Sequence, residues 1–402
     1  MTTELTPRNE RLLLLVLAAI QFGHILDFMI MMPLGPILMR AFAINAGEFG
    51  FLVASYSFSA AAAGLLGATF VDRFERKRLL LVVVALFGLA TLACALAPGY
   101  ATLLVARGLA GTFGGLLGAL VQTMIGDAIP FARRAQATGV VASAFSISTI
   151  AGVPLSLWLA NHLGWHAPFV LVAAIAAVCI AVGRRCLPEL HGHLGAPAHP
   201  LAAAGEVMKE GNHRRALLFS ALVIFSGFMV IPYITIQAVG NVGIAQSEIP
   251  LVYLVGGGAT FFSARAIGRW ADRRGKVAVY RWLALAALLP LLLVTHAGHL
   301  PLWGWLVCST SFFVLISGRM IPAMAIVTSA AQPRLRGTFM SLNGTVQALA
   351  MGLATTLGGA LIEVDAAGHL SGYPLVGYVA MAANLLAVAW VARIAMHTRP
   401  AG

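Results

Sequence analysis

The sequence predicts an all-α membrane protein with twelve transmembrane helices in two similar six-helix halves, and three observations support this prediction. Of the 402 residues, 60% are hydrophobic and 10% are charged, whereas soluble domains carry about 25% charged residues. The apolar runs are about 18 to 28 residues long, and one helix needs ~20 to cross a bilayer core of ~30 Å. Segments in the two halves also match at a constant offset. Barrel strands would be shorter and would alternate in polarity, so the runs indicate helices.

The apolar runs place twelve spans along the chain. The first six lie near residues 12–39, 48–71, 79–97, 101–126, 135–160 and 165–183. The second six lie near residues 215–239, 249–271, 279–296, 301–328, 337–362 and 373–392. The first run is too long for the core of a signal peptide, so we expect it to stay as the first helix.

One long polar connector, residues 184–214, separates the two sets of spans. It predicts an N-terminal half over residues 1–183 and a C-terminal half over residues 215–402. The connector itself is expected to be a cytoplasmic linker, with or without one short surface helix.

Positive charges are concentrated in alternate loops. Of the 26 Lys and Arg residues, 20 fall in the two termini, the loops on one side of the predicted membrane, and the central connector together with Arg215 directly after it. By the positive-inside rule, this side and both termini are cytoplasmic. The net charge of +12 therefore reflects topology and contact with anionic lipid, and we expect no nucleic-acid binding.

Patterns typical of a disulfide, a metal site or an enzyme are missing from the sequence. The four cysteines have no paired spacing, and three of them lie in apolar spans, so neither a disulfide nor a metal site is expected. No nucleophile, base and oxyanion-stabilising group cluster together, and no cofactor loop is present. We therefore expect no cofactor and no enzymatic activity. We also expect the protein to be a monomer.

The two halves repeat each other at an offset of 200 residues, which indicates an internal duplication. The matched pairs are Glu48 with Glu248, Asp72-Arg73 with Asp272-Arg273, and the segment DFMI (27–30) with GFMV (227–230). Because each half has an even number of helices, the repeats share an orientation and are related by an axis along the membrane normal.

Asp27 lies in an almost wholly apolar run, where an unpaired charge costs several kcal/mol. At a rise of about 1.5 Å per residue, Asp27 is ~22 Å from the cytoplasmic boundary near Leu12 and ~8 Å from the outer boundary of a ~30 Å core. Helix four starts outside near Ala101, which places Arg107 ~9 Å below that outer boundary. The matched depths predict that Asp27 and Arg107 pair.

Two interpretations of this pair stay open. Asp27 is a candidate proton carrier, because desolvation and an approaching cationic substrate alter the balance that keeps it ionised beside Arg107. The duplication favours this role, since Gly227 replaces the aspartate in the second half. Alternatively, the pair is only structural and holds helices one and four together. His24, one turn before Asp27 and with an unperturbed pKa near ~6.5, is either a proton relay or a packing residue.

Other polar and polarisable residues in the spans are candidates for a substrate cavity. Interhelical hydrogen bonding or packing is the alternative for most of them, and Arg319 either meets an anionic group or snorkels. Few charges face the predicted pore, so an apolar cavity is expected. The candidates are Phe28, Met31, Gln122, Tyr233, Gln237, Arg319, Asn343 and Gln347.

Two loops give the chain a family resemblance. The segment GRWADRRGK, residues 268–276, resembles the signature loop that joins helices eight and nine in the major facilitator superfamily. The segment GATFVDRFERKR, which starts at Gly67, resembles the copy between helices two and three, although Ala68 and Glu75 stand where glycine is preferred.

Two helices extend the resemblance. The segment RGLAG from Arg107 resembles the fourth-helix arginine motif, and AGVPLSLWLANHLGWHAPF from Ala151 resembles the fifth-helix motif of the bacterial twelve-helix drug:proton antiporters. Ser148 and Ser156 occupy positions where that motif usually has glycine. The resemblance implies the major facilitator fold and location in a bacterial-type cytoplasmic (inner) membrane.

The signature loops suggest a cytoplasmic gate. Carboxylates at helix ends can accept hydrogen bonds from guanidinium groups or from the N-terminus of a neighbouring helix, which would latch the halves when that side is closed. A solvated loop would explain the arginines but not the repeated aspartate. The candidate gate residues are Asp72, Arg73, Arg76, Asp127, Asp272 and Arg273.

These observations predict a secondary active transporter. The resemblance implies proton-coupled efflux of small lipophilic or cationic compounds by alternating access, with protons, a small-molecule substrate and membrane lipid as partners. One alternative is a transporter of a sugar, metabolite or lysolipid that works by symport or flipping. Another is a membrane sensor that transports nothing.

Overall fold

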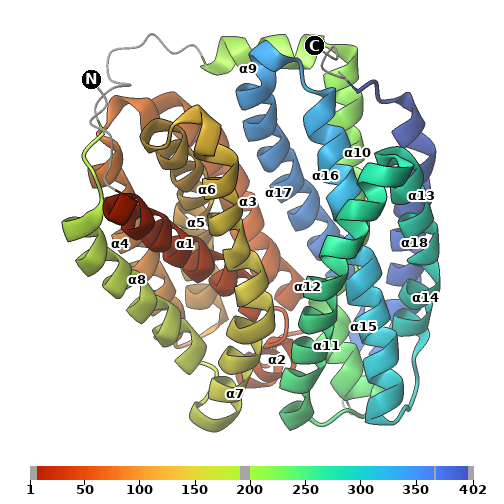
Figure 1. The fold of residues 1–402 in the computed structure, drawn as a ribbon. Coiled ribbons are helices and arrows are strands. Elements are labelled where there is room, and N and C mark those ends of the chain that lie inside the picture. The colour runs from red at the N-terminus through yellow and green to blue at the C-terminus, as the bar shows by residue number, and fades with distance from the viewer. Residues whose placement is uncertain (1–6, 191–199, 366–367, 397–402) are drawn as a thin grey trace. The chain divides into compact units, whose positions relative to one another are not determined.

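The computed structural model describes residues 7–190, 200–365 and 368–396, and within these ranges a few side chains, including that of Asp72, are not described. The chain divides into two compact units, each of which is described by itself. The first consists of Met1–Met31 and Ser55–His199, and the second of Met32–Ala54 and Pro200–Gly402. Figure 1 shows that nearly every element is a helix, which confirms the all-helical fold class.

The first unit contains most of the N-terminal helices. They are α1 (Pro7–Ile30), α3 (Ala46–Phe70) from Ser55 onward, α4 (Arg76–Ala95), α5 (Tyr100–Ala128), α6 (Phe131–Ile147), α7 (Val153–Leu163) and α8 (Ala167–Cys186). A π-helical turn, Ser148–Gly152, joins α6 to α7. Helix α1 packs against α5, α6 and α8, and α4 packs against α5 and α8. Helices α1 and α4 therefore share two neighbours, α5 and α8.

The second unit contains α2, the start of α3 and all helices after residue 199. They are α2 (Gly35–Phe42), α9 (Pro200–Lys209), α10 (Gly211–Phe228), α11 (Ile234–Gln237), α12 (Ile249–Arg274), α13 (Lys276–Ala286), α14 (Leu288–His296), α15 (Leu302–Gly318), α16 (Met320–Ala330), α17 (Arg336–Ala360) and α18 (Tyr373–Trp390). Helix α10 packs against α16, α17 and α18, and α12 packs against α15. The polar connector contains one short helix, α9, as the sequence allowed.

Four expected spans are interrupted, so the expectation of continuous helices was wrong there. The first, expected over residues 12–39, stops at Ile30, turns over residues 31–34 and restarts as α2. Pro33 lies in this turn, and proline supplies no N–H for the helical hydrogen bond. The seventh, ninth and tenth spans are interrupted at residues 229–230, at Ala287 and at Arg319, and a proline follows each break within three residues.

The described residues contain 11 helical segments that are long and apolar enough to cross a membrane. Helix α17 is not among them because Gly, Ser, Thr, Asn and Gln dilute its apolar residues, yet its 25 residues reach about 37 Å at about 1.5 Å per residue. With α17 the count of twelve is consistent with the prediction. After α17, two short antiparallel strands of two residues each pair with each other, β1 (Glu363–Val364) and β2 (Leu370–Ser371). These strands were not predicted.

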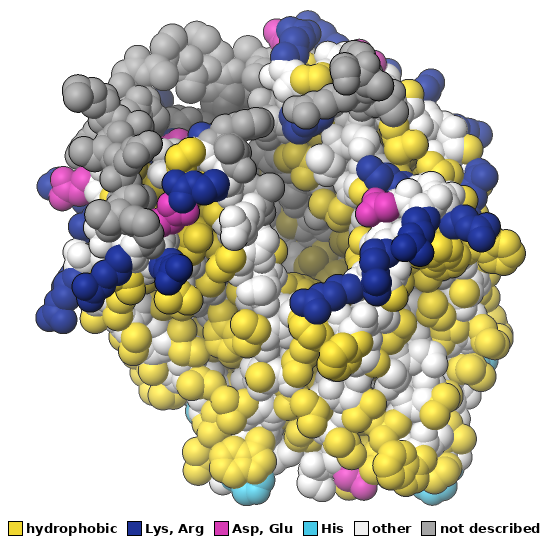
Figure 2. Space-filling model, in the orientation of Figure 1, with side chains coloured by type: hydrophobic (Ala, Val, Ile, Leu, Met, Phe, Trp, Pro, Cys, Tyr) yellow, Lys and Arg dark blue, Asp and Glu magenta, His cyan; other side chains and the backbone are white. Residues whose placement is uncertain are grey.

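The surface of each unit separates charged from apolar side chains. On the face drawn in Figure 2, Lys and Arg gather toward one end of each unit, and hydrophobic side chains cover most of the rest. An apolar band flanked by a basic end is the distribution expected of helices in lipid with positive loops on one side.

Candidate functional site

A buried ion pair joins α1 and α5 in the first unit. Arg107 of α5 donates from Nη1 to Oδ2 of Asp27 at 2.7 Å, and neither side chain is exposed. The same Nη1 is 3.3 Å from the backbone oxygen of Asp27. Thr91 of α4 donates to Oδ1 of Asp27 at 3.4 Å. The contact that the matched depths predicted is therefore present and links three helices.

The rest of the guanidinium faces an aromatic ring and has no hydrogen-bond partner. The ring of Tyr56, on α3, lies 4.6 Å from the Arg107 guanidinium carbon, and the Phe28 ring lies 5.4 Å from that of Tyr56. Among the described residues, Nε and Nη2 of Arg107 and the Tyr56 hydroxyl have no hydrogen-bond partner. A cation over an aromatic face is attracted by the ring quadrupole, so Tyr56 partly compensates the buried charge.

Sequence reasoning missed Tyr56 and Thr91, although depth would have found both. Counted from Glu48 at the outer end, Tyr56 is about 12 Å deep, close to the depth of Arg107. Thr91 is ~18 Å from the cytoplasmic end of its span near residue 79, which leaves ~12 Å to the outer side of a ~30 Å core. Only formal charges were compared by depth, so the neutral members of the site were not recognised.

Two glycines of α5 allow Tyr56 to reach its position. A Cβ at Gly111 would lie 2.8 Å from the backbone carbonyl carbon of Tyr56, and one at Gly114 would collide with the Tyr56 hydroxyl. Helices α3 and α5 therefore approach through small residues, as is common between membrane helices. This close approach fixes the ring beside Arg107.

The other candidates of the first unit have different environments. His24 is half-buried and its Nε2 has no hydrogen-bond partner among the described residues. Met31 is fully buried, Phe28 is half-buried and Gln122 is exposed. Only Phe28 joins the cluster around the ion pair, through its contact with Tyr56.

Candidates in the second unit are mostly held by hydrogen bonds between helices. The Tyr233 hydroxyl donates to the backbone oxygen of Thr355 at 2.5 Å, and Gln237 donates to that of Ala297 at 2.8 Å. Gln347 donates from Nε2 to Ser220 Oγ at 2.9 Å. These contacts match the alternative interpretation, interhelical hydrogen bonding.

Two further residues of the second unit are buried. Asn343 is 1% exposed, and its Oδ1 has no hydrogen-bond partner among the described residues. Arg319 is 0% exposed, so the snorkelling alternative is wrong for this side chain. Its guanidinium is held inside the helix bundle.

The gate candidates of the first unit form one clear contact. Arg76, at the start of α4, donates from Nε to Oδ2 of Asp127 at 3.0 Å and from Nη1 to the backbone oxygen of Val71 at 3.2 Å. The Asp72 side chain lies outside the described part of the structure, and Arg73 is exposed. The predicted pairing of Arg76 with Asp127 is therefore present.

Glu75, which occupies a glycine position of the motif, has a structural role. Its carboxylate accepts hydrogen bonds from the backbone of Lys77 and Arg78 and so caps α4. It also accepts one from the backbone N–H of Leu190 at 2.9 Å, at the start of the connector. An acidic residue at a helix N-terminus is the sequence signal that could have predicted this cap.

The gate candidates of the second unit do not form the expected contacts. Asp272 and Arg273, at the end of α12, are both exposed, and neither has an ion-pair partner in the described part of the chain. In this conformation the loop after α12 is solvated.

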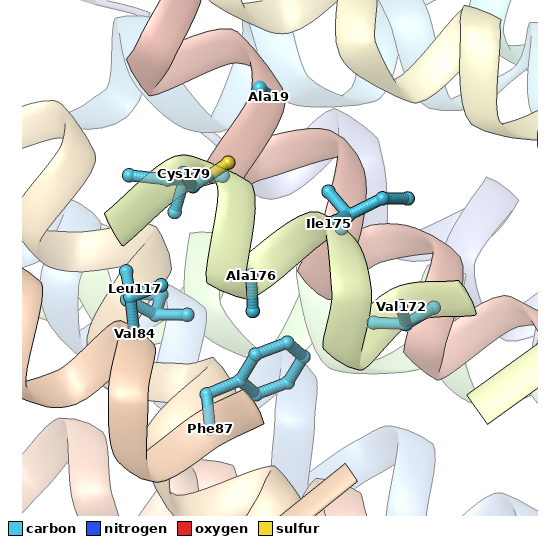
Figure 3. A pocket seen from close by; sticks show the side chains of 10 residues that line it. Ala19, Val84, Phe87, Leu117, Val172, Ile175, Ala176 and Cys179 are labelled. Carbon is cyan, nitrogen blue, oxygen red and sulfur yellow. The ribbon is translucent and has the colours of Figure 1, made fainter. Parts of the chain in front are cut away.

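A separate small cavity lies between α1, α4, α5 and α8, beside Phe87, Ala176 and Cys179 (Figure 3). Its volume is about 10 Å³ and its lining is almost wholly apolar. A cavity of this size holds at most about one water and offers it almost no polar partner. It is a packing defect rather than a ligand site.

Comparisons with known proteins agree with this architecture. A family model described as Major Facilitator Superfamily matches residues 17–355. The multidrug resistance protein Stp of Mycobacterium tuberculosis (strain CDC 1551 / Oshkosh) is 31% identical over 174 residues, which are 43% of this chain and 32% of Stp. The chain thus matches about a third of the length of that relative.

Two further comparisons cover most of the chain. The transcription regulatory protein OpdE of Pseudomonas aeruginosa is 25% identical over 341 residues, which are 82% of this chain and 80% of OpdE. The crystal structure of a bacterial homologue of the human lysosomal transporter Spinster, in an inward-facing and unoccupied conformation, aligns with a TM-score of 0.74. That alignment has 17% identity and covers 96% of this chain and 97% of that chain, so it supports the fold.

Proposed function

This chain belongs to the Major Facilitator Superfamily, a family of membrane transporters rather than enzymes, and we propose that it couples proton movement to the efflux of small lipophilic or cationic compounds. The observation that carries this proposal is the fully buried pair of Asp27 and Arg107. It is the pair that the depth of the two side chains predicts, and the second repeat has no acidic residue at the matching position. A carboxylate that only helped the fold would be expected in both halves.

In this proposal Asp27 alternates between two states. When ionised, it accepts the Nη1 hydrogen bond of Arg107 and neutralises the guanidinium. Protonation removes the negative charge of Asp27. After the proton leaves, an approaching cationic compound can compete with Arg107 for the carboxylate. Asp27 would take up and release a proton in each cycle, and this would couple proton movement to the export of the substrate.

The surroundings of the pair fit an apolar, adaptable substrate. Phe28 and Tyr56 supply aromatic faces, which attract cations. The name of Stp, a multidrug resistance protein, agrees with this substrate class. The cytoplasmic membrane location that the resemblance implies and the cytoplasmic termini that the charge pattern predicts are part of the same proposal.

A sensor function is the second candidate, because OpdE, which matches most of the chain, is named a transcription regulatory protein. A sensor needs to bind a ligand but need not move it or a proton across a membrane. Transport of a sugar, a metabolite or a lysolipid is the alternative within the transporter class.

The deciding experiment measures proton flux in sealed vesicles that contain the purified protein and a pH-sensitive dye. Adding lipophilic cations such as ethidium to the outside should produce proton movement in the parent and none in empty vesicles. Substrate uptake without proton movement would reject the coupling, and binding without either movement would establish the sensor.

A further inference from the structure

The second unit holds a buried arginine without an acidic partner among the described residues. The Arg319 guanidinium is 0% exposed. It donates to Oδ1 of Asn384, to Oγ of Ser226 at 2.8 Å and to the backbone oxygen of Val223 at 3.2 Å. Its Nε has no hydrogen-bond partner in the described part of the chain. All of its acceptors are neutral, and a buried charge that is not paired is strongly unfavourable.

The internal repeat shows where the missing charge would lie. Gly227 occupies the position that corresponds to Asp27, and a Cβ built on it would lie 3.7 Å from Nη2 of Arg319. In the first unit, the residue at this repeat position neutralises Arg107 at 2.7 Å. Each half therefore places an arginine beside the same repeat position, and only the first half supplies the carboxylate.

Both helices at this point are interrupted. Helix α10 ends at Phe228, one residue after Gly227, and Arg319 separates α15 from α16. In transporters, interrupted helices near the middle of the membrane bring charged and backbone groups to ligands and ions. The other neighbours of a Cβ at Gly227, on Ile316 and Ile231, would lie at 3.5 and 3.6 Å, so a Cβ fits at this position at ordinary contact distance.

We propose that Arg319 binds a monovalent anion at Gly227, either a carboxylate group of a transported compound or a free halide. The anion supplies the negative charge that Asp27 supplies to Arg107. This anion site is separate from the proton-coupling site at Asp27. Testing it requires neither a proton gradient nor transport.

The first test measures the thermal unfolding of the purified full-length protein in detergent, in a sulfate buffer of constant ionic strength. Chloride, acetate and benzoate are titrated separately. The parent should show a saturable rise in unfolding temperature, because a ligand that binds the folded state stabilises it by mass action, and Arg319→Gln should show none. A response to chloride alone identifies a halide site, and a response to the carboxylates identifies a substrate carboxylate. No saturable response to any of the three would overturn the proposal.

The second test does not depend on the folding of Arg319→Gln. Gly227→Asp should unfold at a higher temperature than Gly227→Asn without added anion, and it should lose the anion response because its own carboxylate occupies the site. Gly227→Ala, which adds only a Cβ, should keep the response. Equal unfolding temperatures for the Asp and Asn variants would show that Arg319 needs no counter-charge and would refute the site. Asp27→Asn should also keep the anion response, so a failure of proton coupling can be told apart from a failure of this site.

Discussion

At the scale of single residues, the pair of Asp27 and Arg107 has two possible roles with opposite consequences. Asp27→Asn preserves shape and polarity but cannot release a proton. If Asp27 carries the proton, substrate exchange should survive, accumulation driven by a pH gradient should fail, and binding should lose its pH dependence. If Asp27 only staples α1 to α5, the variant should instead lose about 3–5 kcal/mol of stability, since it leaves a buried guanidinium without its carboxylate.

The measurement is therefore paired: gradient-driven accumulation in vesicles and thermal stability in detergent, for Asp27→Asn beside the parent. Glu363→Gln, the analogous substitution at an exposed carboxylate outside the candidate site, is the matched control and should change neither quantity. Normal accumulation by Asp27→Asn would exclude the carrier role. A large loss of stability with residual coupled transport would assign Asp27 to structure.

Tyr56 offers a second test of the same site. Its ring lies 4.6 Å from the Arg107 guanidinium carbon, whereas its hydroxyl has no hydrogen-bond partner among the described residues. Tyr56→Phe keeps the ring and should leave stability nearly unchanged. Tyr56→Leu removes the cation–π contact and should lower stability by ~0.5–2 kcal/mol, as measured by chemical or thermal unfolding. Equal losses in both variants would show that the hydroxyl, not the ring, is important.

At the scale of helices, glycine has two different roles in the first unit. A Cβ at Gly23 of α1 would meet only Ile175 Cγ2, at 3.6 Å, beside the small apolar cavity. A Cβ at Gly111 of α5 would instead overlap the backbone of Tyr56. The first position tolerates a side chain and the second does not.

Gly23→Ala should therefore raise stability by up to ~1 kcal/mol, the difference in helix propensity between glycine and alanine. Gly111→Ala should lower it by about 1–3 kcal/mol, because overpacking forces α3 away from α5. It should also weaken transport by displacing Tyr56 from Arg107. Thermal unfolding of the two variants beside the parent tests this, and the same sign of effect for both would contradict the packing described here.

Helices also show how far the sequence could predict the structure. Hydropathy located the spans because a membrane helix must be about 20 apolar residues long, and depth along two such helices was enough to pair Asp27 with Arg107. The breaks were missed because apolar residues continue through them, as at Pro33, where the chain turns without any loss of hydropathy. The hydrogen bond from Arg319 to Asn384 was missed because a neutral partner leaves no charge pattern in the sequence.

At the scale of the whole molecule, orientation decides in which direction a proton gradient could do work. The positive-inside rule predicts that the basic loops lie in the cytoplasm, and the depth of Asp27 then predicts a position nearer the outer side, at ~8 Å. A proton from outside would reach Asp27 over the shorter distance, which suits the export of a compound in exchange for an incoming proton. If the orientation were reversed, the same site would favour import.

The orientation can be measured with single cysteines in a variant that lacks the four native ones. Gly298→Cys lies between α14 and α15, and Asp272→Cys lies at the end of α12; both positions are exposed. In intact cells, a membrane-impermeant maleimide should label Gly298→Cys, and it should label Asp272→Cys only after the membrane is permeabilised. Labelling of Asp272→Cys in intact cells would reverse the topology. The expected pattern would place the basic ends of both repeats in the cytoplasm and Asp27 nearer the outer side.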